Sequence, residues 1–354
     1  MNHIFDTKCN DLENWLRDQK QPKFRQKQIL QWVIGNRVDS FDEMTNLPKS
    51  LRTALTSDFQ FWSSNVVAHE KAADQTEKLL LGMHDGGQIE CVLIREGSRR
   101  TVCISTQVGC AMGCVFCASG LDGVERNLTT GEIIEQLLRL QTLLPSEERI
   151  SHIVVMGMGE PLANLQNLLP ALEIATHPDY FGISTRRITI STVGLPSAIE
   201  QLASQQRHFH LAVSLHAPND ELRNELVPVN KSIGISQIMS AAEKYFAASG
   251  RRLTFEYVLL ADLNDGKQHA QQLATLLKNT NAMLNVIPYN RVAGLPYETP
   301  SDSSIRQFRS ILEKANINLQ FRQKKGDDIN AACGQLRRKS KTEQLHQIES
   351  PSGD

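Results

Sequence analysis

The sequence has no apolar run approaching the roughly 18 residues that a membrane-spanning helix needs. Its first residues, Met1-Asn-His-Ile-Phe-Asp, also lack the basic stretch and following apolar stretch of a secretion signal. Both absences argue against a membrane or secreted protein. The composition, 40% hydrophobic and 22% charged, is ordinary for a globular chain.

A disulfide framework is also not indicated. The seven cysteines are an odd number, and three of them lie close together between residues 110 and 117. A reducing cytoplasm is therefore the expected compartment. The net charge of −1 excludes a surface coated with phosphate-binding cations. A local patch is still enough to bind RNA, and the best candidate is Arg337-Arg338-Lys339 with Lys341.

The most informative motif is Cys110-Ala-Met-Gly-Cys114-Val-Phe-Cys117, directly after the strand-like stretch Thr101-Val-Cys-Ile-Ser-Thr. Three thiolates at this spacing can hold three corners of an iron–sulfur cluster and leave the fourth iron open. An open iron can chelate S-adenosylmethionine and pass it an electron, which yields a 5′-deoxyadenosyl radical. The alternative is a zinc site, but zinc usually takes four ligands, and no second C-x2-C pair or nearby His completes one.

The order of elements predicts an α/β fold. Residues 10–60 have helical periodicity, and a strand–turn–strand follows over residues 78–94. From about residue 101, strands alternate with helices, which indicates a parallel sheet and, with six or so repeats, an incomplete barrel. The expected strands are 101–106, 152–157, 187–192, 209–215, 253–260, 283–288 and 317–322.

Chemistry in such a fold gathers at the carboxyl ends of the strands. Gly157, Gly159 and Glu160 directly follow one expected strand, so the backbone can approach a ligand closely and the carboxylate can pair with an ammonium group. Polar side chains that follow other strands can line a nucleoside pocket. They are Ser191, Ser214, His216 and Asn290.

The isolated cysteines divide into two kinds. Cys9 and Cys91 are interpreted as small buried hydrophobes. Cys333 is surrounded by glycines and two aspartates, which suits an exposed, reactive thiol. Cys103 lies shortly before the three-cysteine motif.

With these residues the chain resembles the RlmN/Cfr family of radical-SAM RNA methyltransferases over nearly its whole length. The matching motifs are Ser105-Thr-Gln-Val-Gly-Cys110, Met156-Gly-Met-Gly-Glu160-Pro, Ser214-Leu-His-Ala-Pro-Asn-Asp and Gly326-Asp-Asp-Ile-Asn-Ala-Ala-Cys333-Gly-Gln-Leu. The resemblance implies a partial (βα)6 barrel over residues 101–336. It also implies an N-terminal helical accessory domain that helps hold RNA (1–75) and a β-hairpin carrying a base (76–100). The tail (337–354) is expected from its composition to be basic and then disordered, and its part after Lys341 matches nothing in the family.

The resemblance also implies the chemistry. Two S-adenosylmethionine molecules are used per turnover, together with a [4Fe-4S] cluster on Cys110, Cys114 and Cys117. One methylates Cys333, and the other yields the radical that activates this methyl group for addition to an adenine carbon. Glu90 then removes the proton from that carbon. Cys103 attacks the Cys333 sulfur and releases methylated RNA, leaving a disulfide that a cellular reductant reopens.

The resemblance assigns the S-adenosylmethionine contacts to Gly159, Glu160, Ser191, Ser214, Leu215, His216 and Asn290. The expected product is 2-methyladenosine in 23S ribosomal RNA, with transfer RNA as a second candidate substrate and flavodoxin or ferredoxin as electron donor. Two alternatives stay open. One is a C8-directed, Cfr-like resistance enzyme, and the other is a non-catalytic Fe–S module that binds RNA. For Glu90, the alternative is a solvated strand carboxylate.

Overall fold

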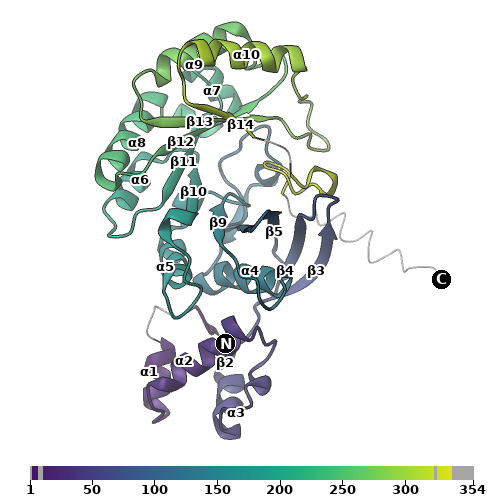
Figure 1. Ribbon diagram of the computed structural model, residues 1–354, viewed down its shortest axis with the longest axis vertical. Coiled ribbons are helices and arrows are strands. Elements are labelled where there is room, and N and C mark those ends of the chain that lie inside the picture. Colours follow the sequence, from purple (N-terminus) through teal and green to yellow (C-terminus); the bar gives the residue numbers. More distant parts are fainter. Residues whose placement is uncertain (1, 7–10, 323–324, 337–354) are drawn as a thin grey trace, which may run out of the picture.

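A ten-stranded sheet forms the centre of the described part of the protein, and a small helical unit lies at one end of it (Figure 1). The computed structural model describes residues 2–6, 11–322 and 325–336. Cys9 lies outside the described residues, and so does the basic cluster Arg337-Arg338-Lys339 with Lys341. No helix in the described part of the chain is long and apolar enough to cross a membrane.

Two different patterns of pairing make up the sheet. Its order is β14-β13-β12-β11-β10-β9-β6-β5-β4-β3, and neighbours from β6 to β14 are parallel, while those from β3 to β6 are antiparallel. The strands are β3 (Ser64–Lys71), β4 (Glu77–Met83), β5 (Gln88–Glu96), β6 (Arg99–Cys103), β9 (His152–Val155), β10 (Ile188–Thr192), β11 (His210–Ser214), β12 (Leu253–Leu259), β13 (Ala282–Pro288) and β14 (Leu319–Phe321). This is the predicted α/β fold with an open, mostly parallel sheet.

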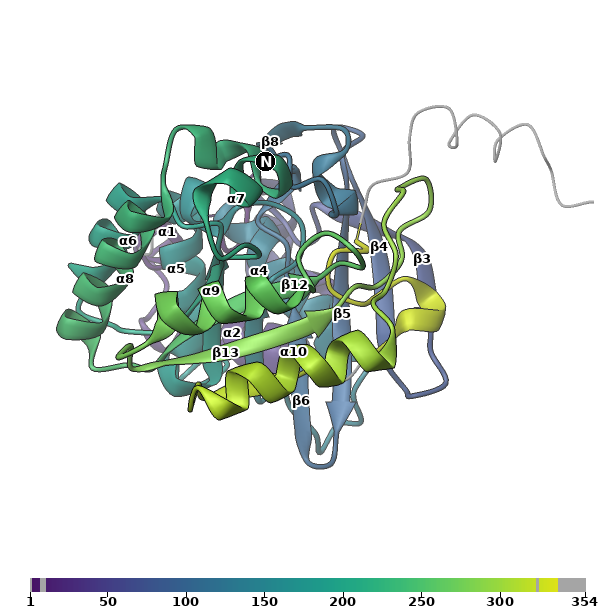
Figure 2. The same ribbon diagram turned by 90° about the horizontal axis from the view of Figure 1, so that it is seen from above.

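Helices cover the outer face of the parallel strands (Figure 2). They are α4 (Thr130–Thr142), α5 (Leu165–Thr176), α6 (Pro196–Ala203), α7 (Asp220–Leu226), α8 (Ile235–Ser249), α9 (Lys267–Leu277) and α10 (Asp302–Lys314). The sequence explains α4 well. Thr129 and Glu132 form a reciprocal capping box at its start, and the predicted face that includes Ile133 and Leu137 is fully buried.

The N-terminal unit contains α1 (Asp11–Asp18), α2 (Phe24–Leu30) and α3 (Lys49–Asp58), with two short paired strands, β1 (Asn2–His3) and β2 (Phe59–Gln60). Its apolar residues, such as Ile29 and Leu55, belong to the same buried cluster as the sheet. The sequence pattern did not predict β3. That strand lies in the range expected to belong to the helical domain, yet it pairs with β4 along its length.

The segment 325–336 crosses the sheet at the carboxyl ends of its strands, where Figure 1 shows it in yellow. On one side it is bonded to the β3–β4 turn, since Asp74 accepts from the Gly326 N–H at 3.1 Å. On the other side the Ala118 N–H donates to the Gly334 carbonyl at 2.8 Å. Cys333 is therefore held between the hairpin and the cysteine motif, although both are distant in sequence.

Candidate active site

The three-cysteine motif forms a loop beyond β6 that is fixed to its surroundings by backbone bonds. The Cys110 N–H donates to the Gly123 carbonyl at 2.9 Å, and the Val115 N–H donates to the Leu226 carbonyl at 3.1 Å. All three cysteines line one cavity of about 910 Å³, its open mouth included. We call this the cysteine cavity.

The cysteine cavity suits an iron–sulfur cluster. Burial raises the pKa of Cys110 to about 11 and also raises those of Cys114 and Cys117, so a positively charged group is needed to hold them as thiolates. Among the described residues, no group of three His, Cys, Asp or Glu is placed to hold a single metal ion.

The glycine-rich loop after β9 closes one wall of this cavity. Gly159 has φ +101°, and a Cβ atom there would lie 2.7 Å from the Gln107 Cβ atom, so only glycine fits without strain. The buried Glu160 carboxylate accepts from the backbone N–H groups of Leu162 at 2.9 Å and Val193 at 2.7 Å. Its burial raises its pKa. Glu160 thus joins the ends of β9 and β10 while facing the cavity.

His216 lies just beyond β11 and has φ +58°, a conformation that residues with side chains rarely adopt. The Val258 N–H donates to its Nδ1 atom at 3.0 Å, so the neutral ring carries its proton on Nε2. Burial lowers the pKa of His216 to about 3, which keeps the ring neutral. The His216 and Phe116 rings pack edge to face, and Phe116 belongs to the cysteine motif.

Asn290, beyond β13, links the cavity to the C-terminal segment. Its Nδ2 donates to the Cys333 carbonyl at 3.1 Å. Its buried Oδ1 atom has no hydrogen-bond partner among the described residues, which is an acceptor suited to an amino group such as that of S-adenosylmethionine. Ser191 and Ser214 also line the cavity.

Leu215 differs from the other expected contacts. Its side chain is fully buried in the core, and it is absent from the described lining of the cavity. Its backbone N–H donates to Glu256, and its carbonyl accepts from Arg223. A contact from Leu215 would therefore have to come from already bonded backbone atoms.

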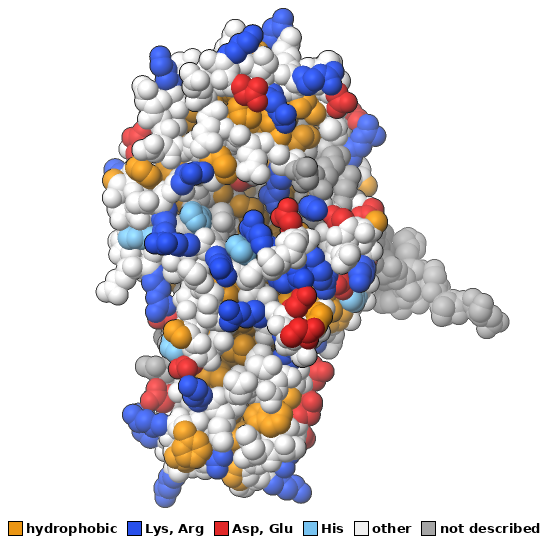
Figure 3. Space-filling view, viewed as in Figure 1, with side chains coloured by type: hydrophobic (Ala, Val, Ile, Leu, Met, Phe, Trp, Pro, Cys, Tyr) orange, Lys and Arg blue, Asp and Glu red, His pale blue; other side chains and the backbone are white. Residues whose placement is uncertain are grey.

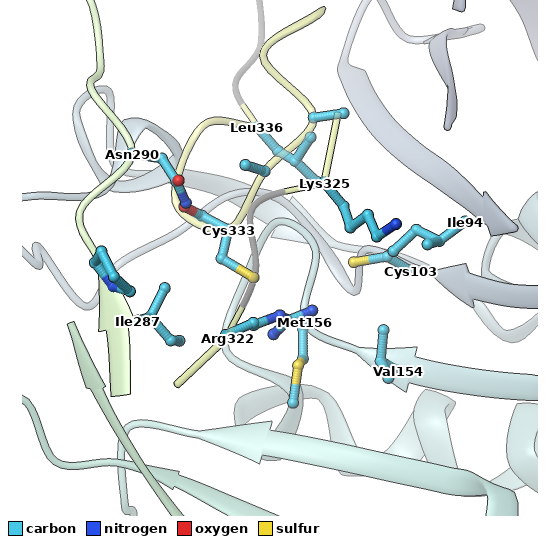
Figure 4. Close-up of a pocket in the computed structure, with 13 residues that line it drawn as sticks. Ile94, Cys103, Val154, Met156, Ile287, Asn290, Arg322, Lys325, Cys333 and Leu336 are labelled. Atoms are coloured by element: carbon cyan, nitrogen blue, oxygen red, sulfur yellow. The ribbon is translucent and has the colours of Figure 1, made fainter. Parts of the chain in front are cut away.

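A second cavity of about 570 Å³ adjoins the first and contains both Cys103 and Cys333 (Figure 4). We call it the thiol cavity. Cys103 ends β6, and burial raises its pKa to about 12. Arg322, directly after β14, also lines this cavity and is hydrogen-bonded to Cys333. Cys333 lines both cavities, so one thiol faces both spaces.

Glu90 is not a solvated strand carboxylate. It is 7% exposed, and its Oε1 atom lies 2.9 Å from Lys78 Nζ. Lys78 also donates to the Asn330 carbonyl at 3.5 Å, in the segment that carries Cys333. Glu90 shares a face of β5 with Ile94, which lines the thiol cavity, but Glu90 itself is absent from the described lining of both cavities.

Sequence reasoning missed several lining residues. Arg322 follows a strand, as the predicted site residues do, so its position was a usable signal. Glu256 was also open to prediction, because it is the one charged residue in β12, a strand of mostly apolar residues. It lines the cysteine cavity and accepts from Asn285 Nδ2 at about 3 Å. Cys91 is fully buried, as expected of a small hydrophobe.

Comparison with known proteins adds family information. Residues 104–274 match the model of the radical SAM superfamily, and residues 2–60 match that of the ribosomal RNA large subunit methyltransferase N-terminal domain. The chain is 60% identical to a probable dual-specificity RNA methyltransferase RlmN of Rhodopirellula baltica, over 95% of this chain and 91% of the relative. It is 43% identical to the protein of the same name from Geobacillus kaustophilus, over 96% and 94%.

A solved structure is also similar. The crystal structure of a radical SAM methyltransferase from Sphaerobacter thermophilus superimposes with a TM-score of 0.92 and 39% sequence identity. The match covers 95% of this chain and 99% of that one. The agreement therefore extends over the sheet, its helices and the N-terminal unit together.

Proposed function

The chain belongs to the RlmN family of radical-SAM proteins, and we propose that it methylates C2 of adenosine in 23S ribosomal RNA and in transfer RNA. Two RNA classes are proposed because the relatives carry the name dual-specificity RNA methyltransferase. The RlmN name also favours C2 over the C8-directed alternative. The cytoplasm is the proposed compartment, because free thiols and an iron–sulfur cluster need reducing conditions.

The observation that carries the proposal is that Cys333 lines both cavities. In the cysteine cavity, Cys110, Cys114 and Cys117 would hold a [4Fe-4S] cluster. The expected contacts Gly159, Glu160, Ser191, Ser214, His216 and Asn290 would hold S-adenosylmethionine, with Leu215 limited to its backbone. When bound, the cluster supplies the electron that cleaves S-adenosylmethionine. A thiol that faces both spaces can take a methyl group on one side and meet an adenine on the other.

Cys333 would accept its methyl group from one S-adenosylmethionine molecule, and activation of that methyl group would consume a second. The carbon then joins adenine C2 as a radical adduct, which loses its unpaired electron to a one-electron acceptor and its C2 proton to Glu90. Cys103 attacks the Cys333 sulfur, the bond from sulfur to the RNA-linked carbon breaks, and that carbon takes up a proton to become the methyl group. Both thiols end as a disulfide, so the cycle needs a dithiol reductant as well as flavodoxin or ferredoxin as electron donor.

Binding of RNA needs local positive charge, because the chain as a whole carries a net charge of −1. Figure 3 shows Lys and Arg side chains gathered over the middle of the molecule. Arg99 and Arg187 both lower the pKa of His152, after its burial, and Arg251 likewise lowers the pKa of His210 after its burial. These cations stand at the amino ends of the strands, at the opposite end of the sheet from the two cavities, so they would contact only RNA beyond the reacting adenine.

Mass spectrometry of nucleosides tests the proposal. Anaerobically reconstituted protein should form 2-methyladenosine in 23S ribosomal RNA and in transfer RNA, given S-adenosylmethionine and an electron donor. Cys114→Ala is the control, and it should lose the cluster and all product, as measured by iron, sulfide and absorption near roughly 400 nm. A product of 8-methyladenosine alone would move the chain to the resistance enzymes. Iron-loaded protein that binds RNA without any product would support the binding module.

A further inference from the structure

Arg223 is a fully buried cation that the proposed reaction does not use. It lies on α7, and its guanidinium binds neutral oxygens at the carboxyl ends of two strands. Nη2 donates to the carbonyls of Val193 at 2.6 Å and Ser214 at 3.0 Å. Nε donates to the Leu215 carbonyl at 3.0 Å, and Nη1 donates to Asn230 Oδ1 at 2.6 Å. These bonds orient the group but leave its charge uncompensated.

No carboxylate among the described residues forms an ion pair with Arg223. The nearest acidic partner is indirect, because Asn230 stands between Arg223 and Asp220, donating from Nδ2 to Asp220 Oδ1 at 2.9 Å. Asp220 also accepts from the Ile235 N–H at 2.8 Å. Burial lowers the pKa of Arg223 to about 10, so it stays charged at neutral pH. A buried charge normally has a partner of opposite sign.

The candidate partner is on the cysteine side. Arg223 and Cys114 lie close enough for their charges to interact. The geometry agrees, because the Val115 N–H donates to the Leu226 carbonyl of α7 at 3.1 Å. Cys114 also packs against the apolar cluster that contains Leu226 and Val227. The helix carrying Arg223 is thus fixed directly behind the cysteine loop.

We propose that Arg223 is the buried counter-charge of the iron–sulfur cluster and raises its reduction potential. A cubane held by three thiolates carries net negative charge, which grows by one on reduction. A fixed cation in a low-dielectric interior stabilises the reduced form more than the oxidised form. This inference rests on the proposed function, because it requires a cluster on Cys110, Cys114 and Cys117. Arg223 is a positioning residue in this role, since it touches no substrate.

The test neutralises this charge without removing the arginine. Asn230→Asp puts a carboxylate against Nη1, while Asn230→Ala, the matched control, loses the same amide with no new charge. Cluster-loaded full-length protein is titrated with reductant, and the reduced cluster is followed by electron paramagnetic resonance. Asn230→Asp should shift the potential to more negative values, and Asn230→Ala should leave it near that of the wild type. Both variants should lose thermal stability, because both lose the bond from Asn230 Nδ2 to Asp220.

A second pair of variants tests the same inference if Asn230→Asp does not fold. Arg223→Lys retains the charge and should keep the potential, whereas Arg223→Met should lower it. An unchanged potential in folded, cluster-loaded Asn230→Asp or Arg223→Met would overturn the inference. So would an equal shift in Arg223→Lys and Arg223→Met, which would assign the effect to hydrogen bonds. Wild-type protein that takes up no iron or sulfide would instead refute the proposed function.

Discussion

The two adjoining cavities are built in different ways. The cysteine cavity is formed by the carboxyl ends of consecutive parallel strands and by one short motif, and buried Arg223 and Glu160 connect those ends. The thiol cavity needs the end of β6 together with the end of β14 and the segment 325–336, which lie more than 200 residues later in the sequence. A parallel sheet therefore supplies the cofactor side almost by itself, whereas the thiol side depends on how the C-terminal segment docks.

The largest difference between the functions of the two cavities is expected on removal of Cys103. Cys103 is among the described lining residues of the thiol cavity but not among those of the cysteine cavity. Cys103→Ala should keep the cluster and the methylation of Cys333 but lose multiple turnover, because nothing releases the RNA. Denaturing gels should show a protein–RNA adduct that collapses on RNase treatment. Cys91→Ala, a buried cysteine of the core, is the matched control and should turn over. Normal turnover by Cys103→Ala would remove its resolving role.

The pH dependence of release sharpens this prediction. Burial raises the pKa of Cys103 to about 12, so at neutral pH it is a thiol and only its small thiolate fraction can attack. Below that pKa, the thiolate fraction rises about tenfold per pH unit. The wild-type adduct should therefore decay faster as the pH rises, when followed in single-turnover experiments. A pH-independent decay would show that another step limits release.

A smaller effect is expected at Glu90, which is near the thiol cavity but is linked to it through Lys78 and Asn330. Glu90→Gln keeps the shape of the side chain and removes its basicity, so RNA product formation should fall about 10²- to 10⁴-fold. Methylation of Cys333 and formation of 5′-deoxyadenosine should continue, and an adduct should accumulate with its C2 proton retained. Glu70→Gln, at the other carboxylate that contacts Lys78, should have little effect on product.

Full product formation by Glu90→Gln would make the buried Glu90–Lys78 pair a purely structural feature. A loss of Cys333 methylation in the same variant would place its effect in the cysteine cavity instead. Either outcome would contradict the assignment of cofactor chemistry to the cysteine cavity and of the steps on RNA to the thiol cavity.

Sequence reasoning was most successful where a local pattern determines the structure. Alternating strands and helices predicted the sheet, and residues at strand ends, such as Ser191 and His216, do meet in one cavity. It missed β3, an edge strand with mostly exposed residues and little apolar alternation. It also missed Arg223, because a charge within Asp220–Leu226 resembles an ordinary surface helix. Its burial depends on carbonyls from β10, β11 and their loops.

The thiol side was harder to predict from the residues alone. Alternation along β5 made a solvated Glu90 reasonable, and its burial results from Lys78 and a segment more than two hundred residues away. The pairing of Cys103 with Cys333 was implied by family resemblance and not by spacing. The structure brings both thiols to one cavity through contacts such as that of Asn290 with the Cys333 carbonyl.

The central claim is that Cys333 carries the methyl group from one cavity to the other. Peptide mass spectrometry tests it directly, on cluster-loaded protein incubated with S-adenosylmethionine and no RNA, with Cys333→Ala as control. The account predicts one added methyl group on the Cys333 peptide and none on the Cys103 peptide. A methyl group on Cys103, or on neither peptide in protein that still methylates RNA, would contradict it.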